Sequence, residues 1–388
     1  MEVGKHVRMM KGLLAALVLA VALSAIVDAQ APTQPPGAPA AKKNPLLKLI
    51  EPWPTPDAMK KRRDDAEALP LFSSTEPYVF TLAADFKALN KDRNPESTKR
   101  FPGEVRIPGE GGKEVTIPVQ LSARGHVRRM ARTCDYVPIR VEFPKQGLAG
   151  TPFAKQEALK LVVQCAKGGD FEQYLLKEYL AYRLFNVITP KSLRARLARV
   201  NYVDQATGQA TGTRHAMFIE DDSDVAKRME GRTVALPRLV FKDVDTDTLM
   251  PMMIFEYMIG NTDFSIYALH NVKLVQRPDK TIHTVPYDFD FSGLVHAPYA
   301  APDRALMLTS VRERFYRGPC KPQPPVDAIV ANFVAKKDQL LALRDAIPGL
   351  DKATKEDVKS YLDEFFSAIK TPKDVRRLFV QCKDKSLM

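Results

Sequence analysis

Short apolar runs with alternating polar residues, separated by Pro and Gly, dominate the chain between residues 76 and 165. β-Branched residues are frequent in these runs, and the combination predicts β-strands. The predicted strands span residues 78–82, 115–121, 137–143 and 158–164. A further strand pair is expected at 194–204 and 213–220, on either side of an Ala-Thr-Gly-Gln turn. The pattern therefore predicts an antiparallel sheet.

The period changes between residues 171 and 185, where leucines and tyrosines recur at helical spacing. Asp170 precedes this segment and is the expected N-cap. A buried helix is predicted at 246–258, followed by a hairpin with strands at 272–275 and 281–286. Later helical segments are expected at 326–346, 355–369 and 372–381. We therefore predict an α+β fold, in which a sheet with one helix precedes a mostly helical region.

The first 29 residues have the three parts of a secretory signal peptide. Lys5, Arg8 and Lys11 give a basic start, an apolar run of about 15 residues follows, and Val27-Asp28-Ala29 offers small residues for cleavage. An uncleaved membrane anchor is the alternative, but the run is short for a span of roughly 20 residues. We expect export to the periplasm or the extracellular space, with no transmembrane segment in the mature chain.

Residues 30–57 are rich in Pro, Ala and Gln and predict an extended linker, because this composition cannot build a hydrophobic core. Beyond it we expect a β-rich region at 58–240 and a helical region at 241–388. The whole chain carries a net charge of +12, from 58 basic and 46 acidic residues. These charges are dispersed, so no nucleic-acid partner is expected.

The chain has four cysteines, Cys134, Cys165, Cys320 and Cys382. An even number in an exported protein predicts two disulfides, for which three pairings exist. Cys134 and Cys165 flank neighbouring strand-like runs, and the other two lie in the C-terminal part, which favours 134–165 with 320–382. Metal ligation is less favoured, because no CxxC pair or clustered His accompanies these cysteines.

Three polar segments follow one another in the second half of the chain. Asp263 lies in a loop after the predicted buried helix, Asn271 opens a short strand, and Asp288 and Asp290 follow the next strand. Carboxylate and amide oxygens suit magnesium, and a loop aspartate can accept a hydrogen bond from a substrate hydroxyl. A structural explanation also exists for each aspartate, as a cap or turn residue.

Lys160 lies inside the apolar run at 158–164, where a charged side chain needs a partner or solvent. Glu172 and Glu178 on the predicted helix are candidate partners, and Glu178 is preferred because it lies mid-helix. In kinases a strand lysine paired with a helix glutamate positions the phosphates of ATP. Strict alternation along the strand would instead place Lys160 on the solvent face.

Several segments between residues 119 and 294 together resemble a known family. They are Leu121-Ser122-Ala123-Arg124-Gly125, Ala158-Leu159-Lys160-Leu161, residues 175–184, Phe218-Ile219-Glu220, Gly260-Asn261-Thr262-Asp263, His270-Asn271 and Pro286-Tyr287-Asp288-Phe289-Asp290. The chain resembles the CotH-type spore-coat kinases, which are secreted atypical protein kinases. The resemblance implies a protein-kinase-like bilobe, with an antiparallel β-sheet N-lobe containing one helix and a mostly helical C-lobe.

The same resemblance implies roles for individual residues. Asp263 would be the catalytic aspartate, and Lys160, paired with Glu178, would contact the phosphates of ATP. Glu220 would lie on the strand beside the nucleotide. Magnesium, or manganese, would bind the side chains of Asn271, Asp288 and Asp290.

The chain departs from the family's pattern at two places. The aspartate and asparagine usually lie closer together than the eight positions between Asp263 and Asn271, so a short insertion must loop out here. Phe264 stands where an arginine often follows the catalytic aspartate.

These observations lead to a functional hypothesis with alternatives. We expect an exported CotH-like kinase that transfers phosphate from ATP to hydroxyls of an extracytoplasmic protein substrate. The alternative is a kinase-fold protein without catalysis, acting as a binding or envelope-structural module. A weaker alternative is a metal-dependent phosphoester hydrolase that uses Asp288 and Asp290. No GxSxG, HExxH or Walker motif is present, which disfavours hydrolases and P-loop enzymes.

Overall fold

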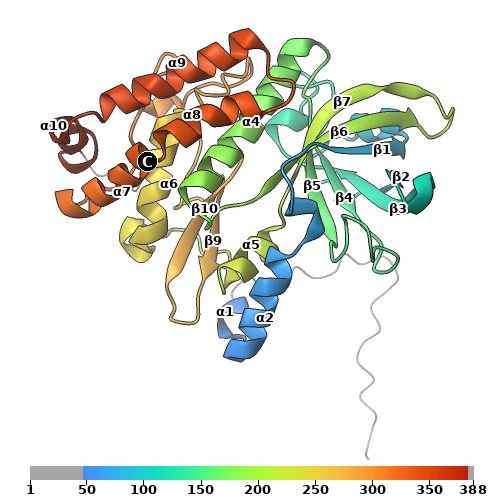
Figure 1. Ribbon diagram of the computed structural model, residues 1–388, viewed down its shortest axis with the longest axis horizontal. Coiled ribbons are helices and arrows are strands. Elements are labelled where there is room, and N and C mark those ends of the chain that lie inside the picture. Colours follow the sequence, from blue (N-terminus) through green and yellow to red (C-terminus); the bar gives the residue numbers. More distant parts are fainter. Residues whose placement is uncertain (1–46, 383–388) are drawn as a thin grey trace, which may run out of the picture. The chain divides into compact units, whose positions relative to one another are not determined.

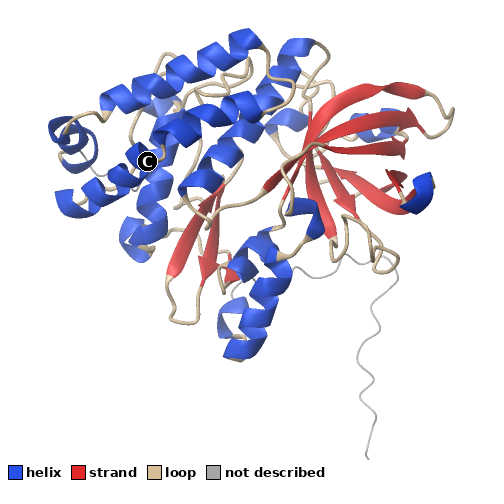
Figure 2. Cartoon of the chain, in the orientation of Figure 1, coloured by secondary structure: helices blue, strands red, loops and turns tan. Residues whose placement is uncertain are grey.

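Seven strands close into a barrel in the computed structural model, which describes residues 47–382 (Figures 1 and 2). They are β1 (Tyr78–Ala84), β2 (Phe101–Pro108), β3 (Glu114–Ala123), β4 (Ile139–Glu142), β5 (Ala158–Val163), β6 (Ala195–Asp204) and β7 (Ala210–Ile219). Their order around the barrel is β1-β2-β3-β4-β5-β7-β6. Neighbouring strands are antiparallel except β1 and β6, whose parallel pairing closes the barrel.

The expectation of a protein-kinase-like bilobe, with an antiparallel sheet as its N-lobe, is therefore wrong. β1 lies along β6 over its whole length, with Tyr78 opposite Ala198 and Ala84 opposite Asp204. Alternation of apolar residues predicts which face of a strand is buried, but it does not predict which distant strand lies beside it. The parallel contact that closes the barrel was for this reason not visible in the sequence.

Strand β2 was not among the predicted elements, because it contains Pro102, Gly103 and Pro108. Proline and glycine normally argue against a strand. At Gly103 the backbones of β1 and β2 approach closely, since a Cβ there would lie only 2.9 Å from the Ala83 carbonyl oxygen. The glycine thus permits a strand pairing that its presence in the sequence argues against.

Helix α4 (Gly169–Ile188) packs against β6 and β7 of the barrel and against helices α6 (Thr246–Ile259) and α8 (Lys337–Ala346). The helix predicted at 171–185 is confirmed. It begins earlier than expected, however, with Gly168 and not Asp170 as its N-cap. Helix α4 therefore contacts both the barrel and the C-terminal helices, and its buried residues include Glu178 and Tyr182.

A small second sheet has the order β10-β9-β8 and consists of β8 (Arg232–Val234), β9 (Val272–Gln276) and β10 (Ile282–Pro286). It confirms the predicted hairpin. The other α-helices are α1 (Leu47–Ile50), α2 (Pro56–Glu67), α3 (Phe86–Lys91), α5 (Asp222–Arg228), α7 (Gln323–Ala335), α9 (Lys352–Ala368) and α10 (Pro372–Val375). The helix predicted at 326–346 is divided into α7 and α8 at Lys336.

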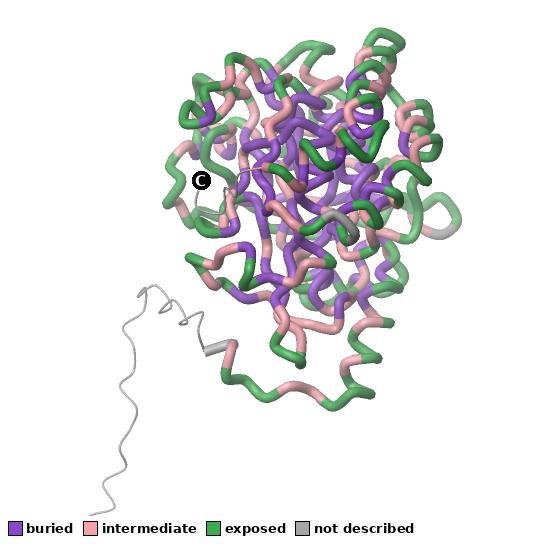
Figure 3. The backbone as a smooth tube through the Cα atoms, turned by 90° about the vertical axis from the view of Figure 1, so that its left-hand side faces the viewer, coloured by how far each residue is buried: buried purple, intermediate pink, exposed green. Residues whose placement is uncertain are grey.

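Two hydrophobic cores hold these elements together. One fills the barrel around Phe80, Phe153 and Phe218. The other lies among α4, α6 and the C-terminal helices and includes Phe255 and Phe365. Buried residues, purple in Figure 3, lie mainly in the interior of the chain. All described residues belong to one compact unit, and the regional boundary expected at residue 240 stays a prediction. The predicted signal peptide and linker residues up to 46 lie outside the described residues. Within residues 47–382, no helix is long and apolar enough to cross a membrane.

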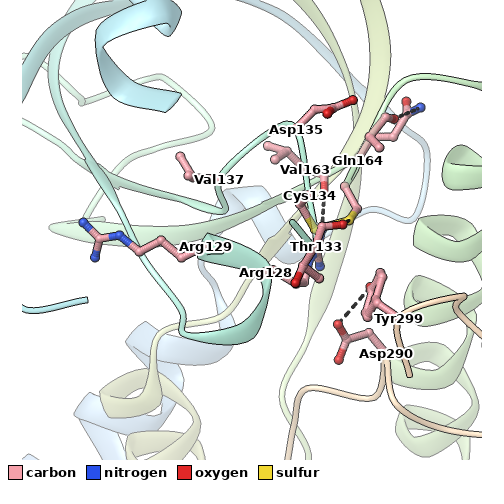
Figure 4. Close-up of a disulfide and its surroundings, with 12 residues drawn as sticks. Arg128, Arg129, Thr133, Cys134, Asp135, Val137, Val163, Gln164, Asp290 and Tyr299 are labelled. Carbon is pink, nitrogen blue, oxygen red and sulfur yellow. Dashed lines mark hydrogen bonds between the residues drawn. A yellow bond between two sulfur atoms is a disulfide. The ribbon is translucent and has the colours of Figure 1, made fainter. Parts of the chain in front are cut away.

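Both predicted disulfides are confirmed, Cys134–Cys165 and Cys320–Cys382. The first ties the loop after β3 to the end of β5, and Arg128 of the same loop donates a hydrogen bond to the Val163 carbonyl. Figure 4 shows this loop next to Asp290 and Tyr299, with Arg129 pointing away from them. The disulfide therefore fixes a loop that borders the candidate site.

Replacing both Cys134 and Cys165 with serine should lower the free energy of unfolding by about 2–4 kcal/mol, because the unfolded chain loses a constraint. Guanidinium unfolding followed by far-UV circular dichroism measures this change. The matched control is wild-type protein unfolded after reduction, which should lose at least as much stability because both disulfides are then open. Equal stability of the serine variant and the oxidised wild type would show that this bond does not form.

Candidate functional site

The loop after α6 brings Asp263 and Asn271 into direct contact. Gly260 ends the helix in the left-handed conformation, and a Cβ at this position would lie 2.0 Å from the Tyr361 hydroxyl oxygen. The Asn271 Nδ2 atom donates to Asp263 Oδ2 at 3.0 Å and to the Asp263 carbonyl at 2.7 Å. The other carboxylate oxygen, Oδ1, lies 3.0 Å from His270 Nε2. Both oxygens of Asp263 are therefore oriented by neighbours.

The insertion expected between Asp263 and Asn271 forms a closed loop. Ser265 and His270 exchange two backbone hydrogen bonds of 2.9 Å, which return the chain to Asp263. Leu269 and Asn271 have positive φ angles of 54° and 52°, an uncommon conformation for residues other than glycine. Such strain is frequent at functional sites, where the surrounding structure maintains it.

Arg317 lies buried beneath this loop. Its guanidinium donates to the carbonyls of Thr262 and Phe264 and lies 5.1 Å from the centre of the Phe264 ring. Burial lowers the pKa of Arg317, while the charges of Asp303, Asp263 and Glu256 act in the opposite direction. The resemblance leads one to expect an arginine at position 264. Phe264 occupies this position instead, and Arg317, from a distant part of the chain, packs against its ring.

Asp288 and Asp290 both follow the end of β10, so the alternation of a strand does not separate them. Asp288 has a φ of 65°, and its N–H donates to the Tyr182 hydroxyl on α4 at 3.0 Å. Asp290 is only 4% exposed, and its Oδ2 accepts a hydrogen bond from the Tyr299 hydroxyl at 3.0 Å (Figure 4). Burial, followed by the charge of Asp288, raises the pKa of Asp290 to about 7. The charge of Asp263 acts in the same direction.

Glu178 extends this acidic group from helix α4. Its carboxylate is 1% exposed and lies 3.5 Å from the Arg128 guanidinium. Burial and the charge of Asp290 raise its pKa, and Arg128 opposes them. Burial also lowers the pKa of Arg128, but Tyr299, Glu178 and Asp290 outweigh this effect and raise it. The positive charge of Arg128 therefore partly compensates the negative charges of Glu178 and Asp290.

The expected pairing of Lys160 with Glu178 is wrong. Lys160 Nζ lies 2.7 Å from Asp222 Oδ1, and Lys273 Nζ lies 3.0 Å from the other oxygen of the same carboxylate. Burial lowers the pKa of Lys160, whereas Asp222 acts to raise it. Lys160 thus points from β5 toward the small sheet and the start of α5, and Arg128 takes the place expected for it beside Glu178.

The side chain of Glu220 is fully buried and is directed to two arginines. It accepts hydrogen bonds from Arg194 N, Arg194 Nε and Arg228 at distances of 2.8–3.0 Å. These contacts tie β7 to the start of β6 and to α5. The carboxylate of Glu220 therefore has a structural role, and the structure does not bring it to the other candidate residues.

Tyr287 connects the two halves of the site. Its N–H donates to the Asn271 carbonyl at 3.0 Å, in line with the β9–β10 pairing of Val272 with Pro286. Its ring centre lies 5.2 Å from Lys160 Nζ and 4.8 Å from Lys273 Nζ. The backbone hydrogen bond therefore places Asn271 beside Tyr287, the residue before Asp288. The ring of Tyr287 in turn contacts Lys160 and Lys273.

Several residues of the site were missed by the sequence-based prediction. They are Arg128, Asp222, Glu256, Lys273, Tyr287, Tyr299 and Arg317. Lys273 carries a recognisable signal, since it is a charge on a short apolar strand directly after Asn271. Arg128, Asp222 and Arg317 carry none, because each contacts the site across a large sequence separation.

No model of a known protein family matches this chain, and a search of curated proteins also gives no match. The likeness to the CotH-type kinases therefore rests on the quoted segments alone. Among residues 47–382, no group of three or more His, Cys, Asp or Glu side chains is arranged to hold a metal ion. A cation at this site would have to combine carboxylates with the Asn271 amide oxygen and with ligands from outside the chain.

Glu256, at the end of α6, lies 1% exposed below the Asp263 loop. Burial raises its pKa to about 8, and the Asn261 side chain opposes this change. The carboxyl is therefore protonated in the folded protein at neutral pH and ionised in the unfolded chain. Stability falls as pH rises between these two pKa values, by about 1.4 kcal/mol per pH unit for one such group.

The Glu256→Gln variant should remove this contribution, because glutamine is neutral at every pH. Its free energy of unfolding, measured in urea from pH 5 to pH 8, should fall less steeply than that of the wild type. Glu356→Gln, at an exposed position on α9, is the control and should keep the wild-type slope. Parallel slopes for the wild type and Glu256→Gln would contradict the buried, protonated state.

Proposed function

We propose that this protein is an exported phosphotransferase that uses magnesium and ATP, or manganese and ATP, and phosphorylates hydroxyl groups of extracytoplasmic proteins. The observation that carries the proposal is the contact of Asp263 with Asn271, adjacent to Asp288. A loop aspartate, an asparagine and a second aspartate are the groups that protein kinases place near the acceptor and the metal. Two disulfides support an oxidising location outside the cytoplasm.

The donor set fits magnesium. Asn271 directs its Nδ2 to Asp263, so its amide oxygen is the atom left to ligate a cation. Asp288 and Asp290 add carboxylate oxygens, which hard cations prefer. Magnesium commonly takes only one or two protein carboxylates and completes its coordination with water and substrate phosphates. A metal that arrives together with ATP would therefore need only Asn271, Asp288 and Asp290 from the chain.

The acceptor hydroxyl would donate its hydrogen bond to Asp263. His270 and Asn271 hold that carboxylate in place, so that little reorganisation is needed when the acceptor binds. The acceptor oxygen forms a bond to the γ-phosphorus while the bond from this phosphorus to the bridging oxygen breaks. ADP leaves, and the hydroxyl proton passes to Asp263. A cation held by Asn271, Asp288 and Asp290 would neutralise charge on the phosphate oxygens.

The second candidate is a binding protein without catalysis. It is favoured by the engagement of both Asp263 oxygens with His270 and Asn271, which occupy positions from which an acceptor hydroxyl would approach the carboxylate. Such a protein would bind ATP or a related anion but would not transfer phosphate.

Asp263→Asn should reduce ATP-dependent phosphate transfer by at least about 100-fold, because the proton acceptor is lost. Oxidised full-length protein is incubated with ATP and magnesium or manganese, and transfer is followed by autophosphorylation and ADP release. Asp247→Asn, an equal charge change at an exposed position of α6, should retain activity.

The possible results separate the two candidates. Thermal stabilisation of the wild type by ATP without any transfer would support the binding protein. Neither stabilisation nor transfer by the wild type would reject both.

A further inference from the structure

Lys160, Asp222 and Lys273 form a compact cluster of charges at the edge of the barrel. They come from β5, the first residue of α5 and β9. The Asp222 carboxylate bridges the two ammonium groups at 2.7 and 3.0 Å. The three side chains are 15%, 27% and 30% exposed, so the cluster is partly shielded from solvent. Removing a charge from water costs free energy, so each of these charges needs a partner of opposite charge.

The cluster has an excess of positive charge. Two lysines and one aspartate leave +1, and the charge of Arg124 also acts on Lys160. The Tyr287 ring lies within 5.2 Å of both ammonium groups and fixes their direction. A single carboxylate thus offers two oxygens to two cations, which is the arrangement that two oxygens of a phosphate group would also satisfy.

A cavity adjoins the cluster. Its volume is about 380 Å³, and Asp222 and Lys273 are part of its wall, together with the apolar side chains of Val234, Leu269 and Leu274. Because Asp222 and Lys273 line this space, a ligand in it reaches the ion pair directly. The cavity is large enough for part of a nucleotide or for a short chain of phosphates.

We infer that Lys160 and Lys273 form a binding subsite for a polyphosphate, and that Asp222 is an internal competitor for this subsite. The inference rests on the proposed function for the identity of the natural ligand, but not for the chemistry of binding. Lys273 is then a second phosphate-binding cation beside Lys160. In the absence of ligand, the Asp222 carboxylate bridges both ammonium groups and occupies the subsite.

The competition determines how variants respond. Asp222→Asn keeps the shape of the side chain but removes its charge, so both lysines become available and polyphosphate should bind about tenfold more tightly. Lys273→Met should weaken binding by roughly 10- to 100-fold, the effect of one charge-assisted hydrogen bond. Lys273→Arg should restore most of the affinity. In the Lys273→Met background, Asp222→Asn should have a smaller effect, since the two residues interact.

The experiment is isothermal titration of oxidised full-length protein with inorganic tripolyphosphate and, separately, with ATP and magnesium. Lys280→Met, in the turn of the same hairpin, is the control for a general change in charge and should bind as the wild type does. Thermal melting without ligand verifies that each variant is folded. Tighter binding of both ligands by Asp222→Asn supports a subsite that recognises phosphates alone. Tighter binding of ATP only supports a subsite that also needs the nucleoside.

Weaker or unchanged binding by Asp222→Asn, or no binding by this variant at all, would overturn the inference. The outcome is independent of the proposed activity. Phosphate transfer by the wild type, with unchanged affinity in both variants, retains the proposed function and rejects the competitor. Tighter binding by Asp222→Asn without transfer retains the competitor and rejects the enzyme.

Discussion

The backbone hydrogen bond from the Tyr287 N–H to the Asn271 carbonyl, 3.0 Å long, joins the two halves of the candidate site. It continues the pairing of β9 with β10 beyond the last regular pair, Val272 with Pro286. On one side of it lies the contact of Asn271 with Asp263, and on the other lies Asp288. The Tyr287 ring extends the same connection to Lys160 and Lys273. A hairpin with a shifted register would separate these groups, because a slip of one residue turns every side chain to the opposite face.

Buried charge is the second constraint on this structure. Glu178, Asp290 and Arg128 are all largely enclosed, and Asp288 adds its charge to them. Burial raises the pKa values of Glu178 and Asp290, so ionising both together is unfavourable. A protein selected for stability alone has little reason to concentrate acids in this way, because apolar residues would fill the space at lower cost. Clusters of perturbed carboxyls are typical of sites that bind cations or move protons.

Much of the local structure could be predicted from the sequence. The helical period at 171–185, the hairpin at 272–286 and the pairing of the four cysteines all correspond to elements of the structure. Asp263, Asn271 and Asp288 were recognised as polar residues at the ends of apolar segments, where side chains are free to take part in chemistry. The helix, the hairpin and the polar segment ends depend on neighbours in the sequence, so a local pattern is enough to reveal them. The disulfides join residues 31 and 62 positions apart, and their pairing was instead predicted from the part of the chain in which each cysteine lies.

Contacts between distant segments could not be predicted in the same way. The parallel β1–β6 pairing closes the strands of the expected antiparallel sheet into a barrel, and no local pattern encodes it. The partner of Lys160 was misassigned for the same reason, since Asp222 lies 62 positions further along the chain and only the fold brings it to Lys160. At Gly103 the local pattern was misleading. Glycine argues against a strand, but here it is required because the backbone of β1 approaches β2 closely at this residue.

We propose that the Asp263, Asn271 and Asp288 group and the Lys160 and Lys273 pair bind one ligand together. A crystal structure with magnesium and a non-hydrolysable ATP analogue tests this most directly. We expect the metal about 2.1 Å from oxygens of Asn271 and Asp288, with the phosphates between the two lysines and Asp222 displaced from them. An analogue bound elsewhere, with Asp222 still bridging both lysines and no metal at Asp288, would show that these two groups do not form one ligand site.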